Sequence, residues 1–169
     1  MKQILMEKGE NIFTNLIEAN KDKIYRICCY YVADEEDRKD LYQETLLNIW
    51  KGYKSFRGEA AFSTWVFRIT VNTALLFLNK KRSIQQKAAL FIESVENEEN
   101  ETYRNHEEIN LLHKGINQLP LLDMIIISLV LEEVSSKEIA LITGLTEPNV
   151  RVRVHRAKAK LKELLKGGE

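Results

Sequence analysis

Apolar residues recur along this chain at the three- and four-residue spacing of α-helices, most clearly near the C-terminus. No alternating pattern long enough for a β-strand and no internal repeat interrupts this spacing. Only two prolines and seven glycines occur among the 169 residues, which also favours helices. The sequence therefore predicts an all-α protein.

Residues 135–165 carry the most informative pattern. Ser135 and Glu138 are spaced as a capping box, and the short helix that they open is predicted to end at Gly144, where glycine tolerates a left-handed backbone. Pro148 suits the first turn of a second helix. The apolar stripe that this second helix is predicted to bury consists of Val150, Val154, Ala157, Leu161 and Leu164. A short capped helix, a glycine turn and a longer helix are the sequence form of a helix-turn-helix.

The second helix is basic around the rest of its circumference, since no acidic residue occurs from Val150 to Lys162. A helix that is merely solvated usually mixes both charges, so the pattern favours DNA binding over an ordinary amphipathic helix. The candidates for contacts with base edges are Arg151, His155 and Arg156, with Val152 for a thymine methyl group. The candidates for phosphate contacts are Arg153, Lys158, Lys160 and Lys162.

Further helices are predicted upstream by the same spacing. They cover residues 11–20, 24–31, 35–53 and 61–82, followed by segments that begin near residue 107 and at Pro120. Residues 83–106 are instead rich in glutamate and asparagine, a composition typical of a flexible linker. The predicted organisation is two small helical domains, residues 1–82 and 107–169, joined by this acidic linker.

The helix over residues 35–53 has two different faces. Its predicted inward face consists of Leu41, Thr45 and Ile49. Another face mixes polar and apolar side chains, namely Asp40, Gln43, Glu44 and Leu47. Such a patch suits a protein partner, although solubility alone would also explain it.

The loop before residue 61 and the helix after it bring aromatic and polar residues together. They are Phe56 and Arg57 in the loop and Thr64, Trp65, Arg68 and Asn72 in the helix. Exposed aromatic rings beside Arg, Thr and Asn suit the unstacked bases of single-stranded nucleic acid. The alternative for the aromatic residues Phe56, Phe62 and Trp65 is packing in the protein core, and this alternative is favoured for Phe62. Lys80, Lys81 and Arg82 are predicted to end the helix, where the helix dipole favours cations.

Composition limits the other classes of function. Lys and Arg together number 25, as do Asp and Glu, so the charge distribution is informative and the net charge is not. Because no apolar run reaches membrane-spanning length and no signal-peptide pattern follows Met1, we expect a cytoplasmic protein without membrane insertion. The adjacent Cys28 and Cys29 suit neither a relaxed disulfide nor a zinc site, and we expect them to be packing residues. No metal spacing or nucleophile accompanies the three histidines, His106, His113 and His155, so we expect no metal, no cofactor and no enzymatic activity.

Residues 13–165 resemble the extracytoplasmic-function (ECF) group of bacterial sigma factors, in the sigma-70 family. Asp40-Leu41-Tyr42-Gln43-Glu44 is similar to the family's "D-L-x-Q-E" helix, which binds the clamp helices of RNA polymerase. Residues 56–72 resemble the segment that opens the minus-ten element. Leu119-Pro120 and residues 135–161 resemble the domain that reads the minus-thirty-five element. The order and spacing of these motifs around an acidic linker carry the resemblance.

The resemblance implies a sigma factor that binds core RNA polymerase, recognises promoter DNA and initiates transcription. It implies polymerase contacts by Asp40, Leu41, Gln43, Glu44 and Leu47. It implies minus-ten DNA contacts by Phe56, Arg57, Thr64, Trp65, Arg68, Asn72, Lys80 and Lys81. It implies minus-thirty-five contacts by Thr146, Asn149, Arg151, Val152, Arg153, His155, Arg156, Lys158 and Lys160. The implied partners are core polymerase, double-stranded promoter DNA and the melted non-template strand, with an anti-sigma factor as an optional addition.

Several positions depart from the family pattern. Glu133 stands where glycine is frequent, and Leu76 where aspartate is common. Pro148, Asn149 and Val152 replace small or polar residues of the second helix, which leaves the promoter sequence open. The alternative function is a helix-turn-helix repressor or activator with an N-terminal sensing domain. It would not bind core polymerase, and it leaves the patch on residues 35–53 unexplained.

Overall fold

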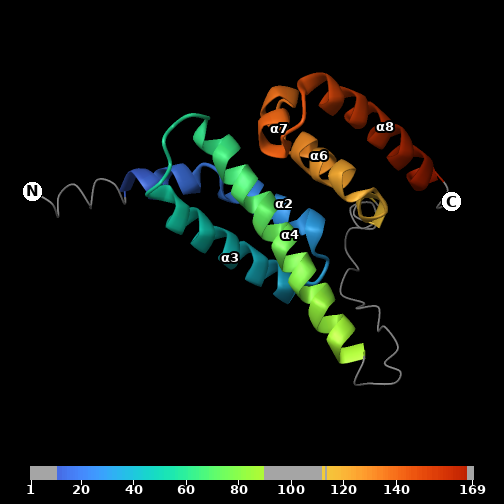
Figure 1. The fold of residues 1–169 in the computed structure, drawn as a ribbon, viewed down its shortest axis with the longest axis horizontal. Helices are drawn as coiled ribbons and strands as arrows, with labels where there is room; N and C mark the ends of the chain where they lie inside the picture. Colours follow the sequence, from blue (N-terminus) through green and yellow to red (C-terminus); the bar gives the residue numbers. More distant parts are fainter. Residues whose placement is uncertain (1–10, 90–111, 113, 167–169) are drawn as a thin grey trace, which may run out of the picture.

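The computed structural model describes residues 11–89, 112 and 114–166. All regular structure in these ranges is helical, which confirms the predicted fold class (Figure 1). Besides helical turns at residues 11–18 and 114–117, the elements are α2 Lys21–Tyr31, α3 Glu35–Tyr53, α4 Phe62–Ala89, α6 Leu121–Leu131, α7 Ser136–Thr143 and α8 Glu147–Lys166. None of the described helices combines the length and the hydrophobicity that crossing a bilayer would require.

The N-terminal half is a packed set of the helices α2, α3 and α4. Helix α3 begins where predicted, because the side chain of Asp34 accepts a hydrogen bond of 2.9 Å from the amide of Asp37. Its inward face is the predicted one, with Leu41, Thr45 and Ile49 all fully buried. Cys28 of α2 is buried in the same core, and burial raises the pKa of its thiol to about 12.

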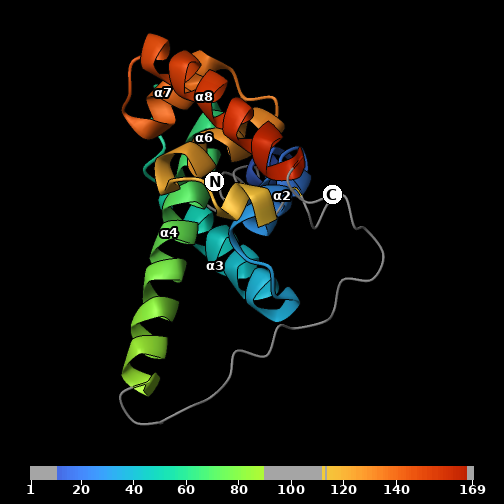
Figure 2. The ribbon, with the colours of Figure 1, turned by 90° about the vertical axis from the view of Figure 1, so that its right-hand side faces the viewer.

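Helix α4 is longer than the sequence pattern predicted. The prediction that the helix ends at Lys80 to Arg82 was wrong, since α4 continues to Ala89. The added residues are good helix formers such as glutamine, lysine and alanine, without the glycine or proline that ends a helix. The final turns extend away from the other helices (Figures 1 and 2). The predicted boundary at residue 82 therefore lies inside a helix.

Part of the predicted linker and helix start lies outside the described residues. This holds for residues 90–106, for the helix start expected near residue 107, and for His106 and His113. The structure describes the chain again at residue 112 and then from residue 114.

The C-terminal half is built around α6. This helix starts after Pro120, as predicted, and its residues 124–129 are all buried, since α2, α7 and α8 contact it. The apolar stripe of α8 faces inward, with Val150, Ala157 and Leu161 buried. The predicted helix-turn-helix is therefore supported by an apolar third helix.

The turn between α6 and α7 contains Glu133, at a position where the family that the chain resembles frequently has glycine. This residue adopts a left-handed backbone with φ of 61°, a conformation that glycine adopts without steric cost. The next helix then starts with the predicted capping box. The Ser135 hydroxyl accepts from the Glu138 amide at 3.3 Å, and the Glu138 carboxylate accepts from the Ser135 amide at 3.1 Å. Helix α7 ends at Gly144, with φ of 74°, also as predicted.

The two halves pack against each other, an arrangement that the sequence did not predict. Helix α4 contacts α7, and α2 contacts α6 (Figure 2). Hydrogen bonds also cross the boundary between the two halves. One of them, of 3.4 Å, joins the buried hydroxyls of Tyr31 and Ser128. The arrangement determines which of the candidate site residues reach solvent.

Candidate protein and nucleic-acid interfaces

One outer face of α3 carries the residues predicted to bind a protein partner. Asp40, Gln43 and Glu44 are exposed, and the side chain of Leu47 is 56% exposed. Leu41 is fully buried, so it supports this face from inside and does not reach its surface.

Trp50 belongs to the same face, although it was missing from the predicted set. It lies seven residues after Gln43, a spacing that places both on one side of a helix, and this signal was available in the sequence. Trp50 remains 43% exposed while its ring packs edge-to-face with that of Phe13, with ring centroids 4.8 Å apart. The face of α3 therefore presents an aromatic and an aliphatic side chain beside two carboxylates, the composition of a protein-binding surface.

An aromatic cluster holds the loop before α4 in place. Phe56, Phe62 and Trp65 lie with their ring centroids 5.0 to 5.6 Å apart. The Trp65 ring also packs on Gly52, where an added Cβ would come within 3.1 Å of the ring. Phe62 packs against the core, as the sequence analysis favoured. Trp65 is half-buried, so the residue is not wholly enclosed by the cluster.

The packing of the two halves separates the predicted polar residues of α4, which are Thr64, Arg68 and Asn72. Arg68 and Asn72 are exposed, as a nucleic-acid contact requires. Thr64 is buried, and its hydroxyl donates a hydrogen bond of 3.0 Å to the Glu138 carboxylate of α7. Hydrogen bonds from Ser135, and to a smaller extent from Thr64, hold the pKa of Glu138 below its ordinary value. Thr64 can contact DNA only in an arrangement that moves α7 away from it.

The basic cluster of α4, which the sequence pattern had placed at the end of the helix, is also divided. Lys80 is exposed, whereas Lys81 forms an ion pair with Asp37 of α3. Arg57 in the loop is exposed.

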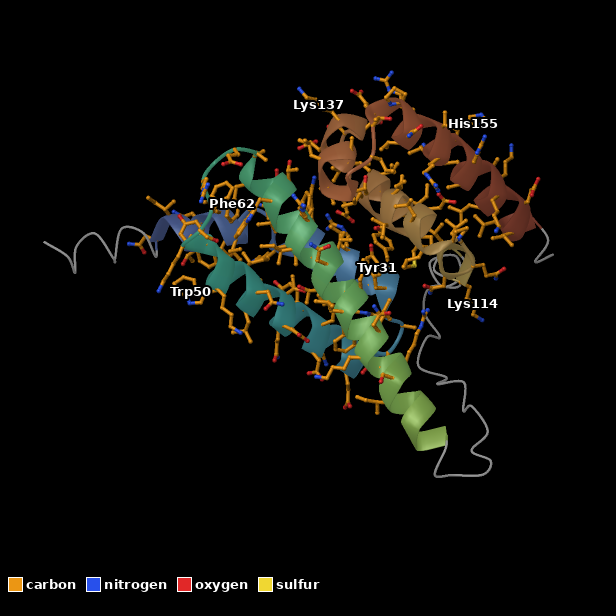
Figure 3. The ribbon with its side chains drawn as sticks, viewed as in Figure 1. Tyr31, Trp50, Phe62, Lys114, Lys137 and His155 are labelled. Carbon is orange, nitrogen blue, oxygen red and sulfur yellow. The ribbon has the colours of Figure 1, made fainter. Side chains whose placement is uncertain are left out.

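Helix α8 and the residue before it, Thr146, expose nearly all of the side chains predicted to contact double-stranded DNA. The exposed set is Thr146, Asn149, Arg151, Val152, His155, Arg156, Lys158 and Lys160. His155 lies on the far side of the molecule from Trp50, so the faces of α8 and α3 are separate (Figure 3). Arg151 forms an ion pair of 2.5 Å with Glu147 within the same helix.

Arg153 is the exception among the basic residues of α8. Its guanidinium donates to the Asp123 carboxylate of α6 at 2.8 Å, and both side chains are partly buried. Together with Leu145, Asn149, Val152 and Arg156, they line an open hollow of about 300 Å³. Asp123 was not among the predicted site residues, because it lies 30 positions from Arg153 and no local pattern connects the two.

In the described part of the chain, no three His, Cys, Asp or Glu side chains lie together in a way that could hold a metal ion.

Comparisons with known proteins match both halves of the chain to one family. The family model for sigma-70 region 2 matches residues 16–84, and the model for sigma-70 region 4 matches residues 109–161. The chain is 30% identical over 173 residues to the ECF RNA polymerase sigma-E factor of Haemophilus influenzae, an alignment that covers 92% of this chain and 90% of that protein. It is 28% identical to RNA polymerase sigma factor SigV of Bacillus subtilis over 147 residues, covering 86% of each.

Two solved structures share the fold. The sigma factor RpoE of Bartonella quintana, solved in complex with the anti-sigma factor NepR, has a TM-score of 0.73 and 25% identity. The comparison covers 91% of this chain and 96% of that one. CnrH, solved in complex with the cytosolic domain of CnrY, has a TM-score of 0.70, with 98% of this chain covered.

Proposed function

Because this chain belongs to the ECF group of sigma-70 RNA polymerase sigma factors, we propose that it binds core polymerase through α3 and promoter DNA through α4 and α8. It acts as a transcription initiation factor, and catalysis belongs to the polymerase that it directs. Its place of action is then the cytoplasm, where polymerase and DNA meet. The proposed functional domains are the two predicted ones, except that the first includes the whole of α4 to Ala89, so the linker to the second domain at residues 107–169 begins after that helix.

The proposal is carried by one observation: separate helices of the same chain expose a mixed apolar and acidic face and a basic face. On α3, Leu47 and Trp50 remain exposed between acidic and polar neighbours, although burial would stabilise them. On α8, the apolar stripe is buried and the basic side faces solvent. A DNA-binding repressor would need the second face, whereas the first face has the composition of a contact with another protein.

On α8, we divide the work between positioning and reading. Lys158 and Lys160 lie late in the helix and contact phosphates, which contribute affinity without sequence information. Arg151, His155 and Arg156 reach base edges in the major groove, where arginine favours guanine. Val152 is 49% exposed and meets a thymine methyl group.

On α4, we assign the melted strand to Arg68 and Asn72 beside the accessible part of Trp65. Unstacking a base costs a few kcal/mol, and stacking on an aromatic ring together with hydrogen bonds offsets this cost. The cluster of Phe56, Phe62 and Trp65 holds the ring in position before DNA arrives. Neither domain has to bind tightly alone, since the chain that joins them raises the effective concentration of the second contact.

We also propose an anti-sigma factor as a partner, since the Bartonella relative was solved in complex with one.

Run-off transcription tests the proposal. The chain is mixed with core polymerase and genomic fragments, and defined transcripts should start downstream of a shared promoter sequence. The double variant Asp40→Ala/Gln43→Ala should assemble less with polymerase and give less transcript. Its helicity should be unchanged, because both side chains are exposed. A chain that binds duplex DNA but neither binds core polymerase nor directs transcription would instead be the repressor or activator.

A further inference from the structure

The ion pair between Arg153 and Asp123 differs from the other ion pair on α8. Arg151 and Glu147 pair on the open surface, with side chains 68% and 39% exposed, so water and salt compete for that contact. Arg153 and Asp123 are 39% and 17% exposed, and they join two different helices. A charge-assisted hydrogen bond that is shielded from water is held more firmly. Arg151 is therefore free to exchange its partner for DNA, whereas Arg153 is not.

The surroundings of the pair strengthen this difference. The Asp123 carboxylate is part of the hollow that Asn149, Val152 and Arg156 line on the exposed side of α8. A phosphate entering the hollow would meet this negative charge, and it would have to separate Arg153 from its partner. Arg156 is exposed, and no described carboxylate forms an ion pair with it.

We propose that Asp123 is a positioning residue that ties Arg153 to α6 and withholds it from the DNA backbone. This inference rests on the proposed role of α8 and changes one part of it, because the sequence pattern had made Arg153 a phosphate contact. Each phosphate contact raises affinity for every sequence alike. By removing one such contact, Asp123 lowers non-specific binding and so raises the ratio of specific to non-specific affinity. Arg156 remains as the cation of the hollow that meets DNA.

The salt dependence of binding tests this inference, because the slope of log affinity against log salt changes by about 0.9 for each neutralised phosphate. The full chain, assembled with core polymerase, is titrated with a promoter duplex and with an unrelated duplex at several salt concentrations. Arg153→Gln should leave the slope unchanged. Asp123→Asn should steepen it by about one unit and raise affinity for the unrelated duplex several-fold, since Arg153 is then released. Asp123→Glu, which keeps the carboxylate, should behave as the wild type.

The double variant Asp123→Asn/Arg153→Gln separates release of Arg153 from simple loss of a negative charge. If release is the cause, the double variant returns to the wild-type slope. If the slope stays steep without Arg153, the carboxylate acted by repulsion and the inference is overturned. It is equally overturned if Arg153→Gln alone reduces the slope by about one unit. Glu147→Gln is the matched control, and it should leave the slope unchanged because Arg151 is already accessible.

Two further results keep the inference separate from folding and from the proposed function. Helicity and thermal unfolding of each variant show whether it folds, and Arg153→Gln decides the question even if Asp123→Asn does not fold. A wild-type assembly that binds no duplex would overturn the proposed function and this inference together. If the wild type binds promoter DNA but Arg153→Gln reduces the salt slope, only the inference about Asp123 is overturned.

Discussion

Arg26 of α2 and Glu132 at the end of α6 form a two-pronged ion pair that joins the two halves of the molecule. The Arg26 guanidinium donates hydrogen bonds of 3.0 and 2.8 Å to the two carboxylate oxygens of Glu132. Glu132 is only 2% exposed, and Lys23 additionally donates to its backbone oxygen at 3.0 Å. The Tyr30 hydroxyl lies 3.3 Å from the carboxylate, and burial followed by this negative charge raises the pKa of Tyr30 to about 12.

Removing one member of this pair should loosen the packing of the halves. Arg26→Ala leaves a buried carboxylate without its main partner, and we expect a loss on the order of 1–3 kcal/mol in the free energy of unfolding. The loss is smaller than for a fully buried pair because Arg26 is itself half-exposed. Urea unfolding measures the loss, and fluorescence energy transfer between labels on α3 and α8 reports whether the halves separate. Lys21→Ala on the same helix removes an exposed ion pair with Glu18 and should change neither. Equal behaviour of the two variants would show that Arg26 has no such role.

Replacing Glu133 by glycine should stabilise the protein. The left-handed backbone at this position costs a non-glycine residue about 1–2 kcal/mol, and part of this gain is offset by the greater freedom of glycine in the unfolded chain. We expect a net gain of about 0.5–1 kcal/mol, measured as a higher thermal midpoint. Gly144→Ala, at a position with φ of 74°, is the mirror experiment and should lower the midpoint. A lower midpoint for Glu133→Gly would mean that the Glu133 side chain stabilises the turn.

Replacing Leu41 or Leu47, which lie six positions apart on α3, by alanine should impair two different properties of the protein. Leu47→Ala should weaken binding to core polymerase at unchanged stability, because its side chain is exposed. Leu41→Ala should cost about 2–5 kcal/mol of stability through the cavity that it leaves. Leu141→Ala on α7 is the matched control, since that leucine is also 56% exposed. If Leu47→Ala and Leu141→Ala bind polymerase equally well, the face of α3 is not the polymerase contact.

Asn72→Ala should impair promoter opening while closed-promoter binding persists. Asn72 is exposed on the face of α4 that also carries Arg68, and it is assigned to the melted strand. Permanganate reactivity of thymines near the start site should fall, and protection of the upstream duplex should remain. Asn15→Ala, at an exposed asparagine outside α4, should leave both unchanged. Loss of upstream binding with normal melting would mean that the two domains have been assigned the wrong way round.

The capping box of α7 should give stability a defined pH dependence. The pKa of Glu138 is lowered in the folded chain from an ordinary value of 4.5, so its charged form stabilises the fold above that pH. This contribution is lost as the pH falls through the lower pKa of the folded state. Glu138→Gln keeps a capping side chain without the charge, so it should be less stable than the wild type near pH 7, by at most about 1 kcal/mol. The difference in unfolding free energy between the two proteins should vanish in acid, where Glu138 is protonated. Urea unfolding at several pH values measures it, and a difference that does not change with pH would contradict the prediction.

The sequence alone determined the local structure of this protein. Asp34, the pair Ser135 and Glu138, and Gly144 mark helix ends through contacts with residues only a few positions away. The buried stripe of α8 follows from helical periodicity for the same reason, since neighbours on a helix face are three or four residues apart. The length of α4 was missed because a cluster of cations is compatible with a helix end but does not cause one.

The tertiary structure decided which of the predicted side chains are available. Thr64 donates a hydrogen bond to a carboxylate 74 positions away in the sequence. Arg153 and Arg26 donate hydrogen bonds to carboxylates 30 and 106 positions away. Such contacts depend on how whole helices are oriented when apolar faces pack, and spacing along the chain contains no measure of that orientation. The sequence therefore identified the helices that present each interface, whereas packing set Thr64 and Arg153 apart from their neighbours.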